Sequence, residues 1–179
     1  MIPRARATGR AIGYQIFYRL PVPLRRRLVR LVVPKYVVGA VTLVRDAEAT
    51  GAGRILLLRQ PPGYSWTLPA GLLQRGEAPV VGAARELYEE SGVRLSPDAL
   101  RPAVPNAVVH AKGWVDVVFE ADVPASRTEL KVDGAEVFEA AFHPLDDLPR
   151  LSRATANLLG YYGIGPRAGE VPPAVPPAA

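Results

Sequence analysis

The helix predicted for residues 79–91 constrains this chain more than any other feature, because the sequence marks both of its ends and one face is strongly acidic. Pro79 stands at its start and a glycine just past its end, which is the favoured arrangement at helix termini. At about 100° per residue, Glu86, Glu89 and Glu90 share a wedge about 100° wide. Apolar side chains lie on the opposite side, so we predict that this helix packs on a core and presents three carboxylates.

Three carboxylates on one helix face destabilise the helix unless something offsets their repulsion. Like charges three or four residues apart are unfavourable, and the helix dipole disfavours anions near the C-terminal end. Charge clustering by itself favours a solvated acidic face with Arg85 as its salt-bridge partner. A divalent cation would relieve both penalties, and hard oxygen ligands with no thiol or imidazole nearby indicate Mg²⁺ or Mn²⁺.

Composition excludes several other kinds of site. The chain has no cysteine, which rules out disulfide scaffolds, thiolate metal sites and cysteine nucleophiles. It has only two histidines, so we do not expect a metal centre built from several of them.

Short apolar runs on both sides of this helix predict strands. Residues 36–44 and 54–59 are predicted to form a hairpin, since they are rich in β-branched and apolar side chains. Further strands are predicted at 106–110, 114–120 and 138–142, and a closing helix at 150–161.

The N-terminal end is basic and the rest of the chain is acidic. Residues 1–45 carry nine arginines, one lysine and no acid, a net charge of +10, whereas residues 46–179 carry −5. Such an arm binds nucleic acid or anionic lipid, or docks on its own acidic body. Residues 11–20 and 23–33 are predicted as two short helices, the second amphipathic. We favour packing of its short apolar stripe on the domain or on a second subunit.

These patterns predict three parts: a basic, helical arm at 1–34, a folded domain at 35–163 and a disordered tail at 164–179 rich in proline, alanine and glycine. No apolar run approaches the roughly 18–20 residues of a membrane span. The N-terminus lacks a long apolar core followed by a cleavage site. We therefore expect no secretory signal and a cytoplasmic location.

The complete spacing around the acidic helix resembles a known family signature. In order it comprises Gly71, five residues, Glu77, seven residues, Arg85-Glu86-Leu87, one residue, Glu89-Glu90, one residue and Gly92-Val93. This pattern resembles the Nudix box at every defined position. Residues 66–69 look like the family's approach to the box, and residues 142–149 like the segment that closes its sheet, so the resemblance covers roughly residues 36–160.

The resemblance implies a fold and an activity. Nudix proteins are α/β/α sandwiches with a mixed sheet between helices, in which the box forms a loop–helix–loop that holds metal. Most hydrolyse a nucleoside diphosphate linked to another group. The expected enzyme is thus a Nudix-type pyrophosphohydrolase acting on a nucleotide or another diphosphate-containing small molecule.

The resemblance also implies site residues. The helix ligands would be Glu86, Glu89 and Glu90, and the carbonyl of Ala70 would be a backbone ligand. An acid from a later loop often completes the site, and the candidates in order of preference are Glu136, Glu139 and Glu120, although a plain exposed loop acid is an equal interpretation of Glu136.

Roles in catalysis and substrate binding follow from these positions. Glu86 is the favoured acceptor of the proton of an attacking water, with Glu136 or Glu139 as the alternative, and Glu90 belongs to the same catalytic cluster. Arg85 would pair with Glu77 or orient a helix carboxylate. Candidates for substrate binding are Arg59, Trp66 and Arg75, with Tyr64, Lys112 and Trp114 as further possibilities that solvated or core positions would equally explain.

Other functions stay open. An isoprenoid diphosphate isomerase of this family would need a catalytic cysteine, which this chain lacks. A regulatory module that binds nucleotides without hydrolysis would usually show a damaged box, and this box is intact. An RNA-directed pyrophosphatase would use the basic arm to follow phosphates, and a homodimer is a further option.

Overall fold

The computed structural model describes residues 14–33, 35–110 and 113–170. The chain divides into two compact units, Met1–Tyr36 and Val37–Ala179, called here the arm and the body. Each unit is described by itself.

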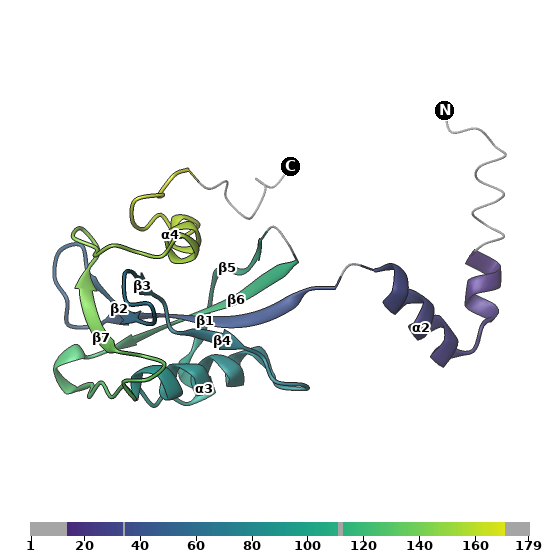
Figure 1. Ribbon diagram of the computed structural model, residues 1–179, viewed down its shortest axis with the longest axis horizontal. Coiled ribbons are helices and arrows are strands. Elements are labelled where there is room, and N and C mark those ends of the chain that lie inside the picture. The colour runs from purple at the N-terminus through teal and green to yellow at the C-terminus, as the bar shows by residue number, and fades with distance from the viewer. Residues whose placement is uncertain (1–13, 34, 111–112, 171–179) are drawn as a thin grey trace. The chain divides into compact units, whose positions relative to one another are not determined.

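A seven-stranded mixed sheet forms the centre of the body (Figure 1). Strands β1 (Val37–Asp46) and β6 (Trp114–Val123) run parallel along their whole length, and the main path through the sheet is β3-β2-β1-β6-β5. Strand β4 pairs antiparallel with the first part of β1, and β7 pairs antiparallel with β2. The remaining strands are β2 (Arg54–Arg59), β3 (Trp66–Thr67), β4 (Ala70–Leu72), β5 (Arg101–His110) and β7 (Glu139–Pro144).

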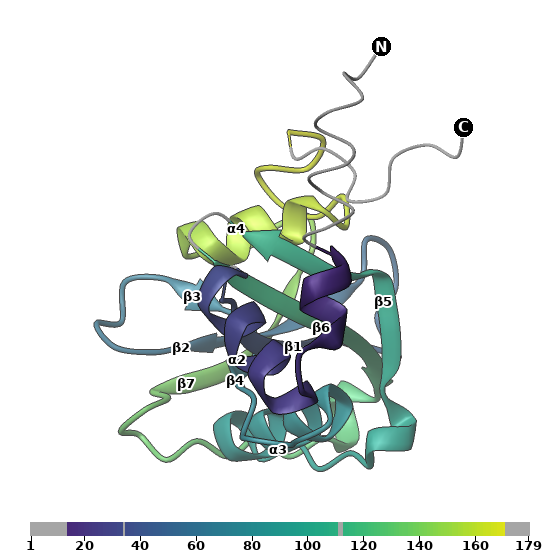
Figure 2. The ribbon, with the colours of Figure 1, turned by 90° about the vertical axis from the view of Figure 1, so that its right-hand side faces the viewer.

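Two helices cover opposite faces of this sheet (Figure 2). Helix α3 (Pro79–Ser91) packs on one face and α4 (Arg153–Gly160) on the other. Strand β1 contributes side chains to the cores on both faces of the sheet, because successive side chains point to opposite faces. Val41 and Leu43 join the core under α4, whereas Ala40 and Val44 pack on the side of α3. This explains why the strand is apolar throughout.

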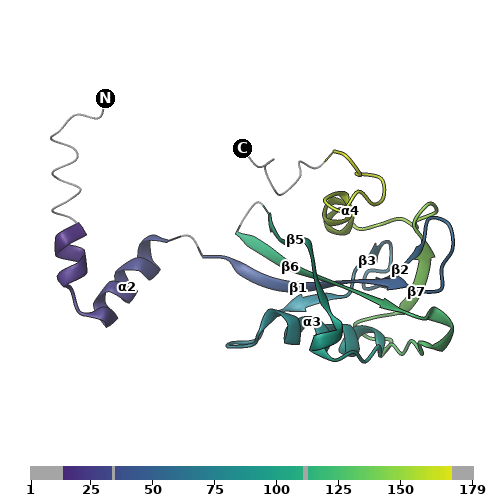
Figure 3. The ribbon, with the colours of Figure 1, turned by 180° about the vertical axis from the view of Figure 1, so that it is seen from behind.

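The expected mixed α/β fold is confirmed, and so are the helix over 79–91 and the strand over 54–59. Gly92 ends α3 in the left-handed conformation, with φ of 75°. The closing helix is shorter than predicted because Ser152 caps it by accepting a hydrogen bond from the Thr155 N–H. Strands β5, β6 and β7 extend beyond the predicted ranges, and Figure 3 shows β1, β6 and β5 side by side from behind.

The arm contains a helical stretch at residues 14–19 and helix α2 (Val22–Val32), with Pro21 at the N-cap of α2. The part of the first predicted arm helix before residue 14 lies outside the described residues, as does the tail from 171 onward. At the other end of the body, Ile164 is buried in the core beside α4. Within the described residues, no helix has the length and apolar character needed to cross a membrane.

Candidate functional site

Two glutamates of α3 lie against the strand that precedes the helix. Glu90 accepts hydrogen bonds from the backbone N–H of Ala70 at 2.8 Å and from the side-chain amide of Gln60 at 2.6 Å. Glu86 lies over Gly71, where an added Cβ would be 2.0 Å from the carboxyl carbon of Glu86. Only glycine at position 71 leaves room for this carboxylate, so β4 and α3 together form a narrow acidic cleft.

The environment of Glu90 disfavours its charge. Burial raises the pKa of Glu90 to about 7, and the nearby charges of Glu86 and Glu136 act in the same direction. The hydrogen bonds from Ala70 and Gln60 oppose this increase and do not cancel it. The ionised form of Glu90 is therefore unfavourable in this position, and a bound cation would reduce that cost.

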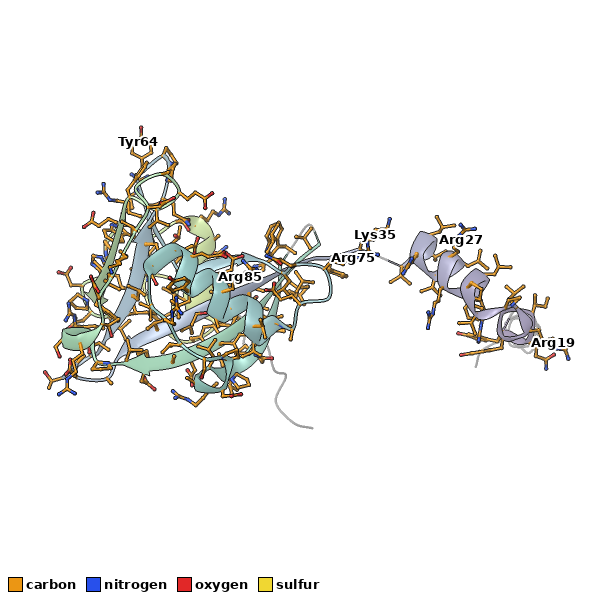
Figure 4. The ribbon with its side chains drawn as sticks, turned by 90° about the horizontal axis from the view of Figure 1, so that it is seen from below. Arg19, Arg27, Lys35, Tyr64, Arg75 and Arg85 are labelled. Atoms are coloured by element: carbon orange, nitrogen blue, oxygen red, sulfur yellow. The ribbon has the colours of Figure 1, made fainter. Side chains whose placement is uncertain are left out.

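Arg85 connects the box loop to the helix carboxylates. Its guanidinium donates to both carboxylate oxygens of Glu77, at 2.9 Å each, to Glu86 at 2.7 Å and to Glu89 at 2.9 Å. It also donates to the carbonyl of Leu72 at 3.2 Å. The two bonds from Arg85 to Glu77 lower the pKa of Glu77 to about 2, and a hydrogen bond from the N–H of Gln74 acts in the same direction. Figure 4 labels Arg85 on the exposed side of α3.

The loop after β6 carries Glu136, whose charge acts on Glu90. Asp133 accepts hydrogen bonds from three consecutive N–H groups, one of them that of Glu136, and so shapes the loop. The N–H of Lys131 donates to the carbonyl of Ser91 at 2.8 Å, which ties the loop to the end of α3. An added Cβ on Gly92 would lie 2.8 Å from the Cβ of Lys131, so this contact also depends on a glycine.

The three loop or strand acids considered from the sequence have different surroundings. The charge of Glu136 acts on Glu90 and raises its pKa. Glu139 is instead paired with Arg59 at 2.7 Å, and Glu120 lies 3.9 Å from Arg101. Of the three, Glu136 is the one that the structure associates with the helix carboxylates.

The residues of the cleft fit a hard divalent cation by their chemistry. The available donors are carboxylate and backbone oxygens, the ligands that Mg²⁺ and Mn²⁺ prefer. Within the described residues, no three acid or histidine side chains converge closely enough to form a ready-made metal site. The reason is visible in the contacts, because Arg85 binds Glu86 and Glu89 while Gln60 and Ala70 bind Glu90. Arg85 is the cation that balances two of these carboxylates here.

A cavity of about 310 Å³ opens beside this cleft, between the sheet and α4. Gln60, Ala70 and Gly71, which contact the two carboxylates, line one side of it, and Leu68 and Leu158 form apolar walls. Trp114 and Asp116 line it as well. Asp116 accepts a hydrogen bond from the indole N–H of Trp114 at 2.9 Å and lies 2.8 Å from Nε2 of His110.

Wider grooves of about 720 and 790 Å³ lie elsewhere on the body, and neither is lined by Glu86 or Glu90. The smaller cavity is not lined by these two carboxylates either, but Gln60, Ala70 and Gly71, which contact them, do line it. Glu89 lines the groove of about 720 Å³.

The three substrate-binding candidates lie outside the lining of this cavity. Arg59 is paired with Glu139, and Arg75 is exposed on the loop before α3. Trp66 packs against the core and meets the ring of His143 edge to face at 4.3 Å. Tyr64 projects from the loop between β2 and β3 (Figure 4).

Sequence reasoning missed two residues that the structure brings to the cavity. Gln60 carries no pattern in the sequence. Asp116 had a signal, since it is an acid at a position of β6 whose neighbours on the same side of the strand are Trp114 and Val118.

Comparisons with known proteins match the body of this chain to one domain family. The family model of the NUDIX domain matches residues 35–160. A human protein named 8-oxo-dGDP phosphatase NUDT18 is 32% identical over 139 residues, which cover 75% of this chain and 38% of that protein. An RNA pyrophosphohydrolase of Zymomonas mobilis is 36% identical over 70 residues, covering 39% of this chain and 41% of that protein. This chain thus spans well under two thirds of the length of either relative.

The fold is also similar to solved structures. A MutT NUDIX hydrolase from Burkholderia pseudomallei superposes with a TM-score of 0.53 at 26% identity, over 68% of this chain and 93% of that one. A UDP-X diphosphatase gives the same TM-score of 0.53 at 19% identity, over 76% of this chain and 65% of that one, and this likeness concerns the fold alone.

Proposed function

Because this chain belongs to the NUDIX domain family, we propose that it is a pyrophosphohydrolase that cleaves a diphosphate bond in a nucleotide or related small molecule with the help of Mg²⁺ or Mn²⁺. One observation carries this proposal. Glu86 and Glu90 pack against Gly71 and Ala70, which line a cavity of about 310 Å³, and burial raises the pKa of Glu90 to about 7.

The metal would be held by carboxylates of α3 and by its neighbours. In this proposal the ligands are Glu86, Glu89, Glu90, Glu136 and the carbonyl oxygen of Ala70. When bound there, a divalent cation neutralises charge on a diphosphate and lowers the pKa of a coordinated water.

The side chains of the cleft have distinct tasks. Glu86 accepts the proton of the attacking water, since its carboxylate packs against Gly71, which lines the cavity. Arg85 is a positioning residue, because its bond of 2.7 Å to Glu86 is backed by two bonds to Glu77. Glu136 is the alternative proton acceptor, and its loop is supported by Asp133.

The cavity suits a nucleoside better than a bare diphosphate. Its walls are largely apolar, and Trp114 offers an aromatic surface that is 41% exposed. Asp116 accepts a hydrogen bond from the indole N–H of Trp114 at 2.9 Å and so fixes the orientation of this aromatic surface. A nucleoside diphosphate derivative is therefore the proposed substrate, and the relative named for 8-oxo-dGDP acts on a substrate of this class.

The test is a panel of nucleoside diphosphate derivatives, dinucleoside polyphosphates and nucleoside triphosphates incubated with the full chain and Mg²⁺. Phosphate is measured after treatment of the products with a phosphatase. We expect turnover of at least one nucleoside diphosphate derivative, lower by about 10² or more with Glu90→Gln under the same conditions. Absence of turnover across the panel, with either Mg²⁺ or Mn²⁺, would refute the proposal and favour a binding module.

An RNA-directed activity is a second candidate, supported by the basic arm and by the similarity to an RNA pyrophosphohydrolase. The same assay includes RNA with a 5′-triphosphate. Faster release of phosphate from this RNA than from any nucleotide would favour this candidate over the first.

A further inference from the structure

Helix α2 of the arm separates apolar and basic side chains along its length. With Leu28 as the reference, Leu24, Leu31 and Val32 lie within about 60° of it around the helix axis. Arg26 and Arg30 lie about 160° away, on the opposite side. The helix is therefore amphipathic, and at 11 residues it is about 16 Å long.

The apolar strip of α2, formed by Leu24, Leu28, Leu31 and Val32, is not covered by the described residues of the arm, 14–33 and 35–36. Leu31 and Val32 are 81% and 83% exposed, and no residue of α2 is buried. A contiguous exposed apolar strip bordered by charge marks an interaction surface.

The basic residues of the arm have no acidic partner in their own unit, because the sequence has no acid before Asp46. Residues 14–33 include five arginines. Arg25 stacks over the ring of Tyr18 at 5.7 Å, and Arg27 and Arg19 are labelled in Figure 4. The arm thus needs an anionic partner from outside.

The acids of the body are largely engaged within the body. Most of the acid side chains in its described part accept hydrogen bonds from backbone N–H groups or pair with a basic side chain, and Asp46, Glu77 and Asp122 are examples. The basic partners are Arg54, Arg59, Arg85, Arg101, Lys131 and Arg167. Most of the body's acids therefore already have a partner within the body.

We infer that α2 binds an anionic lipid surface, lying in the interface with its leucine and valine side chains in the acyl region and its arginines at the phosphates. Both halves of the helix then have a suitable environment, since hydrocarbon accepts the apolar strip and lipid phosphate accepts the arginines. Arg25 and Arg27, which border the apolar strip, are long enough to reach the headgroups from there. RNA would satisfy only the arginines and would leave the aliphatic strip in water.

The experiment measures co-sedimentation of the full chain with phosphatidylcholine vesicles that contain or lack phosphatidylglycerol. We expect binding only to the vesicles with anionic lipid, and weaker binding at high salt. Arg26→Ala with Arg27→Ala should weaken it at least about tenfold, since each arginine near the surface contributes on the order of 1 kcal/mol. The matched control removes two exposed arginines of the body, Arg127→Ala with Arg150→Ala, and should bind like the original chain.

A second pair of variants separates lipid from other occupants. Leu31→Asn with Val32→Asn keeps every charge and should also lose about tenfold in vesicle binding, because two apolar side chains no longer enter the acyl region. Circular dichroism and the melting midpoint of the body check that both chains are folded.

Three outcomes would overturn the inference. They are vesicle binding that this asparagine pair leaves unchanged, binding to RNA but not to vesicles, and a dimer in solution that the asparagine pair converts to a monomer. None of them depends on hydrolysis, so failure here is distinct from failure of the proposed enzyme.

Discussion

Neighbouring glutamates on α3 lie in opposite environments. Glu90 faces the sheet, bonded to a backbone N–H and to the half-buried amide of Gln60, whereas the Glu89 side chain is 55% exposed and bonds only Arg85 in the described structure. Both belong to the same acidic wedge in the sequence. The difference indicates that helix geometry places these charges on one face, while the contact with β4 desolvates Glu90. A bound cation would therefore stabilise ionised Glu90 more than ionised Glu89.

Removal of metal should have the largest effect on turnover of all the changes considered. We expect EDTA to abolish turnover and Mg²⁺ or Mn²⁺ to restore it. Because the cation would neutralise Glu90, Mg²⁺ should also raise the melting midpoint of the original chain, and raise that of Glu90→Gln less. Differential scanning fluorimetry with and without Mg²⁺ measures this, and turnover that survives EDTA would contradict it.

Substitution of Glu90, the desolvated glutamate, should have the second-largest effect on turnover. Glu90→Gln should lower turnover by about 10² or more while the fold stays intact. The native pKa of about 7 lies above the ordinary value of 4.5, so the native state binds more protons than the unfolded state between these values. Metal-free stability of the original chain should therefore fall from pH 4.5 to 7, and Glu90→Gln should melt higher above pH 7. A gap in melting midpoint that does not change with pH would be inconsistent with this account.

An added methyl group at position 71 tests the contribution of Glu86 to turnover. Gly71→Ala places a methyl group where the Glu86 carboxylate lies, so that carboxylate must move. We expect turnover to fall about tenfold to a hundredfold with little loss of stability, because the displaced group is the end of a flexible side chain. Gly51→Ala, where a Cβ would meet nothing within 4 Å, is the control for a glycine substitution elsewhere. It should keep full turnover, although its φ of 70° strains an alanine and should lower stability somewhat.

Substitution of Glu89, the exposed glutamate, should lower turnover less than substitution of Glu90. Glu89→Gln leaves Arg85 bonded to Glu77 and Glu86, so we expect a loss of turnover of about tenfold or less and no change in the melting midpoint. A loss as large as that of Glu90→Gln would remove the distinction between the two glutamates.

The smallest effect on turnover should come from Glu77, which is held away from the cavity by Arg85. Its native pKa of about 2 lies below the ordinary 4.5, so its ion pair stabilises the fold fully above pH 4.5 and is lost as the pH falls towards 2. Glu77→Gln should therefore unfold about 2 kcal/mol more easily at pH 7. This deficit should close in acid, and urea unfolding at both pH values measures it.

Local patterns predicted much of this molecule. The start at Pro79, the stop at Gly92 and the shared wedge of Glu86, Glu89 and Glu90 follow from rules that act within a few residues. The strand at 54–59 was equally local, being a short apolar run between turn residues. Strands β3 and β4 were not predicted, because two or three residues are too short to show alternation.

The sequence by itself determined the helix, its acidic face and the glycine that ends it. Only the tertiary structure decided that Glu90 is desolvated, that Gln60 binds it and that Asp116 lines the cavity beside it. The reason is physical, since burial and charge at one atom depend on chain segments that are tens of residues apart and meet only when the sheet assembles.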